Sequence, residues 1–439
     1  MKSLFEVFAN EWRSLVRSKT ILMLLVASVA WMFAAPQLFT GDGTADGFRQ
    51  MSLHYSLGGV AAMLAITLTI AAAGSVAKER AAKRLALTMV RPVRYFAIAL
   101  GKMLALAACG ALVLGVATAV EFARSGNSGA SAGARNVCRH VLKPIMPPVR
   151  EEAEAMYADY MASSNTPVAV KQAKKEVVLR MLANRAVDRY DTIGTNGVWR
   201  WKFEEKVKSK SEKGKSAESG RVSVRLKFST MFDQRDDVEG ELRFGDYSGV
   251  VSNITQAVIE VPLGSGSGRG SGSGSVSGEW LEFRNTGKNQ VMLRPRRDVE
   301  LLVPADAFGW NLGRAYLELV AMLALLIAFG VFLGTALGRP TALFTAIAVL
   351  LLSEMAPSVV DNYVDELETD KVDAVGLAIT RFSSYVTKPV SSLRPLEALS
   401  LDECVESREV LRVLACDLVL LPLLFALLSA LVMPRKQDF

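Results

Sequence analysis

Six apolar runs divide this chain, and each is long enough, or nearly long enough, to cross a lipid bilayer. A helix rises about 1.5 Å per residue, so about 20 apolar residues are needed to span a hydrocarbon core of about 30 Å. The runs lie at 20–36, 57–77, 96–120, 314–337, 341–360 and 412–433. The 439-residue chain is therefore predicted to be an α-helical membrane protein with six transmembrane helices.

The first run follows a basic N-terminus, so a cleaved signal peptide is the alternative to a retained helix. The 19 residues ahead of it contain Glu6 and Glu11, and five more runs follow, which favours retention. Within residues 1–19 apolar side chains recur at helical spacing, and charged side chains occupy the opposite face. This segment is predicted to be an amphipathic helix that lies in the membrane interface and contacts lipid.

Lysine and arginine are unevenly distributed among the connections between the runs. Residues 1–19 contain four of them and residues 78–94 contain six, whereas residues 37–56 contain only Arg49. Short cationic connections are retained in the cytoplasm, so both termini are predicted to be cytoplasmic. The net charge of +7 then follows from membrane topology, and no nucleic-acid partner is expected.

Two segments are then predicted to be extracytoplasmic, 121–313 and 361–411. The first is an inserted α+β domain, in which a helical region at 150–191 precedes residues that alternate between apolar and polar. About seven short strands separated by turn residues predict an antiparallel β-sandwich over 197–303. The second segment is acidic at its start and amphipathic towards the last run. The membrane parts are spans 1–3 in 20–120, spans 4–5 in 314–360, and span 6 with a cytoplasmic tail in 412–439.

Trp199 and Trp201 lie in the first predicted strand, on either side of Arg200. We expect at most one of the two indoles to face the core of the sandwich. The other is then a candidate ligand platform, for example a ring on which a carbohydrate stacks. Packing of both rings within the domain is the alternative.

The cysteines and histidines give little support to a metal site or a catalytic centre. Cys138 and His140 resemble half a metal site, but the chain has only two histidines and no second pair of ligands at suitable spacing. The same scarcity leaves no nucleophile and base to pair, which disfavours a membrane-embedded hydrolase. Cys138 and Cys404 are both predicted to be extracytoplasmic, where a disulfide and two free thiols are the open alternatives.

The basic segment between the second and third runs carries a recognisable pattern. A Glu-Arg pair is followed by a leucine, a proline and a basic residue, and a Gly-Lys pair opens the third run; the positions are Glu79, Arg80, Leu85, Pro92, Arg94, Gly101 and Lys102. In this order the segment resembles ABC transporter permeases of the type-2 exporter class. The N-terminal amphipathic helix and the six runs agree with that family. Lys83 and Arg84 depart from it, because Gly-Thr is usual at their positions.

This resemblance implies that residues 78–94 contain the coupling helix, which docks in a groove of a separate cytoplasmic ATPase subunit. The docking residues would be Glu79, Arg80, Lys83, Arg84, Leu85, Pro92 and Arg94. The chain has no Gly-x-x-x-x-Gly-Lys-Ser/Thr run to cradle a phosphate, so it is not expected to be an enzyme or to hold a cofactor. ATP and Mg would bind to the partner. The resemblance also implies a homodimer, or a pair with a homologous permease, in the bacterial inner membrane.

Three acidic residues fall inside the predicted spans, namely Glu318, Glu354 and Asp417. An ionisable group at membrane depth costs several kcal/mol unless it is paired or hydrated. In the predicted topology all three lie one or two turns below the outer surface, and we expect them to line a polar outer vestibule. The alternative is that each side chain simply reaches the membrane interface.

These observations predict a permease subunit of an ATP-driven exporter, which couples a separate ATPase to movement of a substrate across the membrane. One alternative belongs to a different class of protein. In it the spans anchor the external β-sandwich as an assembly or mechanotransmission protein, and the ATPase performs mechanical work without moving cargo across the bilayer.

Overall fold

The computed structural model describes residues 2–38, 51–81, 94–127, 137–145, 149–163, 168–171, 174–203, 222–229, 237–245, 247–255, 257–263, 280–338, 340–349 and 394–435. The chain forms two compact units. The membrane unit comprises Met1–Ala130 and Phe308–Phe439, and the soluble unit comprises Ser131–Ala307. The soluble unit is narrower than the predicted 121–313, because the helices on either side of it extend further than the apolar runs.

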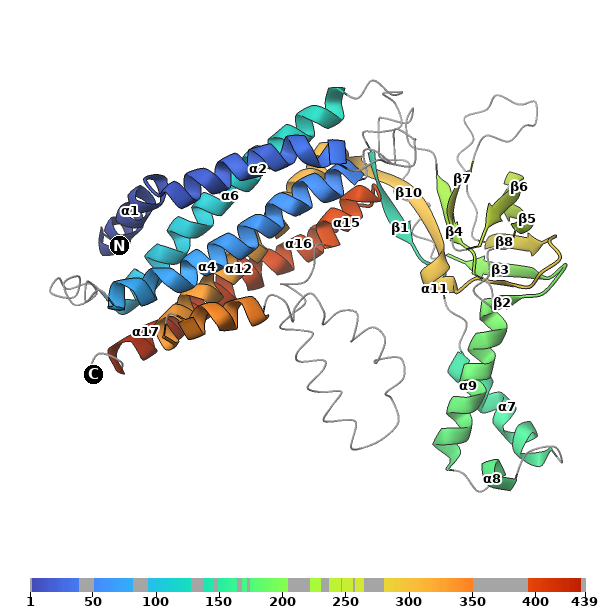
Figure 1. The fold of residues 1–439 in the computed structure, drawn as a ribbon. Coiled ribbons are helices and arrows are strands. Elements are labelled where there is room, and N and C mark those ends of the chain that lie inside the picture. The colour runs from blue at the N-terminus through green and yellow to red at the C-terminus, as the bar shows by residue number, and fades with distance from the viewer. Residues whose placement is uncertain are drawn as a thin grey trace. The chain divides into compact units, whose positions relative to one another are not determined.

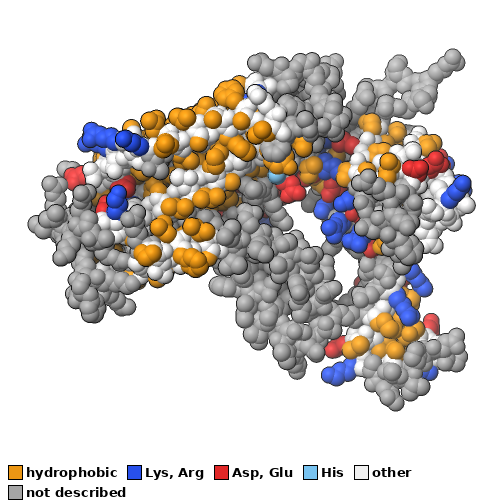
Figure 2. All heavy atoms as spheres, in the orientation of Figure 1, with side chains coloured by type: hydrophobic (Ala, Val, Ile, Leu, Met, Phe, Trp, Pro, Cys, Tyr) orange, Lys and Arg blue, Asp and Glu red, His pale blue; other side chains and the backbone are white. Residues whose placement is uncertain are grey.

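The membrane unit consists of helices that run roughly side by side (Figure 1). Their bounds are α1 Lys2–Val16, α2 Lys19–Leu38, η1 Leu53–Leu57, α4 Gly58–Ala81, α6 Tyr95–Asn127, α12 Phe308–Ala336, α15 Arg394–Ser400, α16 Ser407–Val413, η2 Leu414–Leu420 and α17 Leu421–Arg435. Four stretches of the described chain are long and apolar enough to cross a membrane: Leu53–Glu79, Tyr95–Arg124, Phe308–Ala336 and Ser407–Met433. Hydrophobic side chains cover much of the visible surface of these helices (Figure 2).

Four of the six predicted spans therefore correspond to long apolar helices, and the other two are not confirmed. The first predicted span falls on α2, whose apolar stretch Leu22–Leu38 is shorter than the other four. The fifth falls on a short apolar helix at Pro340–Val349, and the rest of that run lies outside the described residues, as does the acidic start of 361–411. The last span begins at Ser407, earlier than predicted, because α16, η2 and α17 follow one another without a break.

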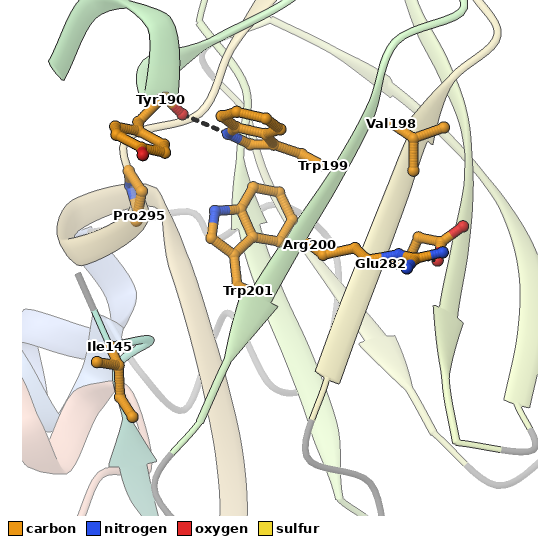
Figure 3. A pocket seen from close by; sticks show the side chains of 8 residues that line it. All are labelled: Ile145, Tyr190, Val198, Trp199, Arg200, Trp201, Glu282 and Pro295. Atoms are coloured by element: carbon orange, nitrogen blue, oxygen red, sulfur yellow. Dashed lines mark hydrogen bonds and ion pairs between the residues drawn. The ribbon is translucent and has the colours of Figure 1, made fainter. Parts of the chain in front are cut away.

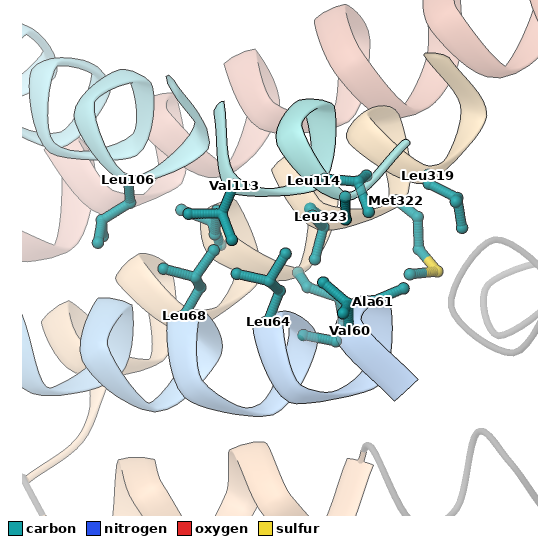
Figure 4. Close-up of a cluster of buried hydrophobic side chains, with 14 of the residues drawn as sticks. Val60, Ala61, Leu64, Leu68, Leu106, Val113, Leu114, Leu319, Met322 and Leu323 are labelled. Carbon is teal, nitrogen blue, oxygen red and sulfur yellow. The ribbon is translucent and has the colours of Figure 1, made fainter. Parts of the chain in front are cut away.

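Helix α12 is the most enclosed of these four spans, with 78% of its most apolar window buried. Two glycines let it approach α4 closely. A Cβ at Gly330 would lie 2.8 Å from the carbonyl oxygen of Thr69, and a Cβ at Gly334 would overlap the carbonyl oxygen of Ala73. Small residues allow helix backbones to pack closely in lipid. The leucine, valine and methionine side chains of α4, α6 and α12 then form the core of the membrane unit (Figure 4).

The soluble unit contains two four-stranded antiparallel sheets and a small two-stranded one, in the orders β1-β10-β4-β7, β3-β8-β5-β6 and β2-β9. The strands are β1 Val137–Leu142, β2 Thr192–Ile193, β3 Val198–Lys202, β4 Ser223–Lys227, β5 Asp237–Phe244, β6 Tyr247–Ile254, β7 Val258–Pro262, β8 Trp280–Asn285, β9 Val291–Met292 and β10 Val299–Ala307. A short helix, α11 Pro295–Asp298, precedes β10. Strands β1 and β2 lie before the predicted sandwich range 197–303 and had not been predicted.

Both four-stranded sheets contribute to one hydrophobic core. Val224, Leu226 and Leu301 come from the first sheet, and Leu242 and Phe283 come from the second. Along β5 the burial alternates from residue to residue, as expected when one face of a sheet is covered by another layer. The predicted layered β-architecture is therefore present, although its extracytoplasmic position is not tested by the fold.

The helical part of the soluble unit consists of α7 Val149–Ala162, α8 Val168–Lys171 and α9 Lys175–Asp191. These helices overlap the predicted helical region 150–191, and α8 and α9 are separate helices. Lys174 has an extended backbone, with ψ of 141°, so α9 begins at the next residue. Helices α7 and α9 pack through Ala153, Val178 and Leu182.

Candidate functional site

A buried lysine ties three helices together at one end of the membrane unit. The Nζ atom of Lys102, on α6, lies 2.7 Å from Glu79 Oε1 on α4 and 3.0 Å from Glu11 Oε2 on α1. The side chain of Lys102 is only 3% exposed, whereas those of Glu11 and Glu79 are 15% and 35% exposed. Two carboxylates therefore neutralise one buried ammonium group, and we call these three residues the Lys102 cluster.

The residue before Lys102 explains how α1 comes close enough to join the cluster. A Cβ on Gly101 would lie 2.8 Å from Val7 Cγ1 and 3.3 Å from the backbone nitrogen of Phe8, so only glycine leaves room for α1. Val7, Glu11 and Leu15 are spaced four residues apart and therefore share the face of α1 that meets the bundle. Gly101 thus leaves space for α1, and Lys102 binds α1 through Glu11.

The aromatic side chains of α1 form a separate stripe. The rings of Phe5 and Phe8 stack at 6.4 Å between centroids, and those of Phe8 and Trp12 stack at 6.1 Å. Phe5 is 68% exposed. An amphipathic helix with exposed aromatic residues is suited to the membrane interface, and the location of residues 1–19 there stays a prediction.

Two residues of the Lys102 cluster lie on the two helices that flank the predicted coupling segment. Glu79 is two residues from the C-terminal end of α4 at Ala81, and Lys102 is in the second turn of α6, which begins at Tyr95. The ion pair therefore joins the helix that enters this segment to the helix that leaves it. Glu11 links both of them to α1.

The predicted docking residues are placed only in part. Glu79 points to Lys102, Arg80 lies in α4, and Arg94 is exposed immediately before α6. The other four predicted docking residues lie outside the described residues; they are Lys83, Arg84, Leu85 and Pro92. Their role in ATPase docking stays a prediction.

Two of the three predicted vestibule acids come near each other. Glu318 lies on α12 and Asp417 on η2, and the two carboxylates are close enough to repel, as are Glu318 and Glu409 on α16. Asp417 is only 4% exposed, and Glu318 Oε1 is buried without a hydrogen-bond partner among the described residues. Glu354 lies outside the described residues. The sequence had not indicated that Glu409 belongs to this group.

Replacing Glu318 with leucine should stabilise the membrane unit by about 1–3 kcal/mol, because it removes a buried polar atom for which the described residues supply no hydrogen-bond partner. A second carboxylate supplies the control. Glu121 is also largely enclosed, with 3% of the residue exposed, but its Oε1 accepts a hydrogen bond from Arg124 at 2.9 Å. Glu121→Leu should therefore destabilise. Thermal unfolding of the two purified variants in one detergent measures both effects, and a lower midpoint for Glu318→Leu would contradict the prediction.

A hollow of about 480 Å³ opens beside β3 in the soluble unit (Figure 3). Aromatic and aliphatic side chains from several elements form most of its wall, and one ion pair joins Arg200 to Glu282 at 2.8 Å. The lining residues are Ile145, Tyr190, Val198, Trp199, Arg200, Trp201, Glu282 and Pro295. Tyr190 donates a hydrogen bond to Glu152, which, together with burial and the carboxylate charge, raises the pKa of the phenol.

The expectation that at most one of Trp199 and Trp201 faces the core was wrong. Residues i and i+2 of a strand point to the same face, so the two indoles must share a side. Trp201 is 4% exposed and belongs to the core, and Trp199 is half-buried and packs against the same core. The Trp199 indole also donates a hydrogen bond to the carbonyl of Tyr190. Neither ring is a freely exposed platform, but both line the hollow.

The cysteines and histidines form no metal site among the described residues. Cys138 and His140 lie on β1, in the edge position of the first sheet. Cys138 and Cys404 are each disulfide-bonded, whereas Cys109 and Cys416 are free thiols.

Comparisons with known proteins address the membrane part of the chain. Residues 7–146 match the family model described as ABC-2 family transporter protein. No curated protein and no solved structure matches the chain. The matched residues contain Glu11, Glu79 and Lys102, together with the predicted coupling segment. The match covers about a third of the chain, supports the resemblance to ABC-2 type permeases over those residues and, with the apolar helices, indicates a multi-pass membrane protein.

Proposed function

We propose that this chain is the membrane subunit of an ATP-driven exporter in the bacterial inner membrane, with both termini in the cytoplasm. A separate cytoplasmic ATPase would bind ATP and Mg and would dock on the segment between α4 and α6. A second permease, either another copy of this chain or a homologue, would complete the path. The observation that carries the proposal is the Lys102 cluster, which holds both flanks of that segment.

The cluster gives a physical route for the coupling. When the ATPase moves the segment between residues 81 and 94, the force reaches Glu79 on one side and Lys102 on the other. Because Lys102 is bonded to both Glu79 and Glu11, helices α4, α6 and α1 would move as one group. Helix α12 packs against α4 through Gly330 and Gly334, so the displacement would continue to the most enclosed helix of the membrane unit. Rigid-body movement of packed helices is a common form of such transitions.

We place the soluble unit on the extracytoplasmic side. The topology that puts residues 78–94 in the cytoplasm puts the chain after α6 on the opposite side. The disulfide-bonded state of Cys138 and Cys404 supports this assignment, because disulfides persist in oxidising compartments and are rare in the cytosol. The predicted pairing of these two cysteines is tested by the mass of tryptic peptides with and without reduction.

The docking of the ATPase is tested by reversing charge at the two ends of the coupling segment, with Glu79 left in place. In Arg80→Glu/Arg94→Glu, co-purification of an ATPase from native membranes should fall at least tenfold, because docking is expected to involve these cations. The matched control is Lys171→Glu/Lys174→Glu in the soluble unit, where both lysines are exposed. Equal recovery of the ATPase with both double variants would remove the docking assignment.

Transport is separated from mechanical transmission by a second measurement. The complex is reconstituted in vesicles, and ATP turnover is compared with accumulation of candidate cargo in the lumen. In an exporter, Arg80→Glu/Arg94→Glu should lower both ATP turnover and cargo accumulation. Turnover without accumulation of any cargo would instead favour an assembly or mechanotransmission protein.

A further inference from the structure

The hollow beside β3 is unusual in that consecutive residues of one strand line it. Val198 and Arg200 point to one face of their sheet, whereas Trp199 and Trp201 point to the other. A cavity above a single face would be lined by alternate residues only. Because residues from both faces line this hollow, it lies along the edge of the strand (Figure 3).

That edge is open in hydrogen-bonding terms. Strand β3 is the terminal strand of its sheet and pairs only with β8 among the described strands. Asn285 donates its backbone N–H to the carbonyl of Gly197 at 3.0 Å, which makes this a hydrogen-bonded pair of the ladder. In an antiparallel ladder such pairs alternate with non-bonded ones. The backbone N–H and C=O groups of Trp199 and Trp201 therefore point towards β8, and those of Val198 and Arg200 point away from the sheet.

The chain itself shows that the outer edge accepts a partner. The backbone N–H of Ile145 donates to the carbonyl of Lys202 at 2.8 Å, which is the next outward-facing position after Arg200. Among the described residues, Lys202 is the last position of this edge with a backbone partner. The outward N–H and C=O groups of Val198 and Arg200 form no backbone hydrogen bond there. Unpaired N–H and C=O groups on an edge strand are a template for another extended chain.

The side chains around this edge indicate what kind of chain fits. Tyr190, Pro295 and the two indoles form an apolar wall, and the charges of Arg200 and Glu282 compensate each other. Trp201 Nε1 is buried at this wall, on the side of Tyr190 and Pro295, and has no hydrogen-bond acceptor among the described residues (Figure 3). The site therefore offers outward backbone groups, an indole donor that has no acceptor in the described part of the chain, and a largely apolar hollow whose two charges form an ion pair.

We propose that this edge binds an extended peptide segment, which adds as a strand beside Val198 and Arg200 and places one large uncharged side chain in the hollow. A peptide backbone supplies donors and acceptors at the spacing of a strand, and pockets beside the strand give side-chain selectivity. An oligosaccharide has hydroxyl groups without this repeat and is the competing ligand. The proposal does not depend on the ATPase, because it concerns the soluble unit alone.

The test uses the full-length protein in detergent and a library of fluorescein-labelled heptapeptides. Each peptide alternates threonine with valine and carries phenylalanine, tryptophan, leucine or lysine at its centre. Fluorescence anisotropy should show binding of the aromatic and leucine peptides, and at least tenfold weaker binding of the lysine peptide. Methylation of the peptide backbone nitrogens should abolish binding, because the peptide is held at the edge by backbone hydrogen bonds.

The matched variants are Val198→Pro and Val198→Thr. Of the backbone hydrogen-bonding groups, proline removes only the N–H of residue 198, which faces outwards, and proline is tolerated where an edge N–H points away from the sheet. Val198→Thr controls for the loss of the valine side chain. Val198→Pro should weaken peptide binding at least tenfold while the thermal midpoint stays within a few degrees, and Val198→Thr should bind like the unaltered protein. Equal binding by Val198→Pro, binding of backbone-methylated peptides, binding of xylo- or malto-oligosaccharides alone, or no binding in the library would each overturn the proposal.

Discussion

Lys102→Met should destabilise the membrane unit by about 3 kcal/mol and should abolish stimulation of the partner ATPase by this chain. The reason is electrostatic. Removing one partner of a buried ion pair leaves its counter-charge uncompensated, and here two carboxylates would remain beside an apolar side chain. Thermal unfolding in detergent and ATP turnover of the co-purified complex measure the two effects.

Two further variants separate the coupling role of the cluster from its stabilising role. Lys19→Met changes an exposed lysine at the start of α2, outside the predicted coupling segment, and should leave both measurements unchanged. Glu11→Gln/Glu79→Gln/Lys102→Met removes the whole charge cluster, and a buried cluster that is neutralised together loses little stability. We expect stability to recover in this triple variant while ATP stimulation stays low. Recovery of both would show that the cluster only stabilises the fold.

Gly334→Ala should destabilise the membrane unit by about 3 kcal/mol, which is the upper range for overpacking in a well-packed core. The added Cβ would overlap the carbonyl oxygen of Ala73, which is backbone and cannot rotate away. Helices α4 and α12 must then separate, and the core between them loses its close packing. The midpoint of thermal unfolding should fall, and ATP-driven activity should fall with it.

The control for this prediction is Gly74→Ala, at the residue that follows Ala73. Gly74 is on α4 next to Ala73, and a Cβ added there meets no atom within 4 Å. Alanine is preferred to glycine in a helix by about 1 kcal/mol, so Gly74→Ala should be neutral or stabilising. The same chemical change is therefore expected to have opposite signs at Gly334, which contacts Ala73, and at Gly74, the residue that follows Ala73 on α4. Equal destabilisation by the two variants would refute the close approach of α4 and α12.

The sequence predicts the membrane unit well where hydrophobic length is the deciding quantity. Three of the four long spans overlap the predicted runs at 57–77, 96–120 and 314–337, and the fourth extends 412–433 towards the N-terminus. The ends of these helices were missed, because polar residues such as Glu121 continue α6 beyond its apolar stretch. Hydropathy reports where a helix is apolar and gives no information on where its polar turns stop.

The contacts of the candidate site were harder to predict. Gly101 and Lys102 were recognised as part of a family pattern, but their partner on α1 was not, because Glu11 had been counted among the charges of an interfacial helix. Its position four residues from both Val7 and Leu15 was the available signal. For Trp199 and Trp201, strand alternation was enough to place both rings on one face, whereas the hollow beside them depends on Tyr190 and Pro295, which are distant in the sequence.

The order of synthesis gives the Lys102 cluster a further consequence. Helices α1 and α4 precede α6 in the chain, so both carboxylates have already been made when Lys102 leaves the ribosome. A cation that enters the membrane at this point can be neutralised at once by residues of the same polypeptide. The N-terminal helix thus acts as an assembly partner for α6, and a chain that lacks residues 1–11 would have to insert α6, its second long span, with only one of the two compensating carboxylates.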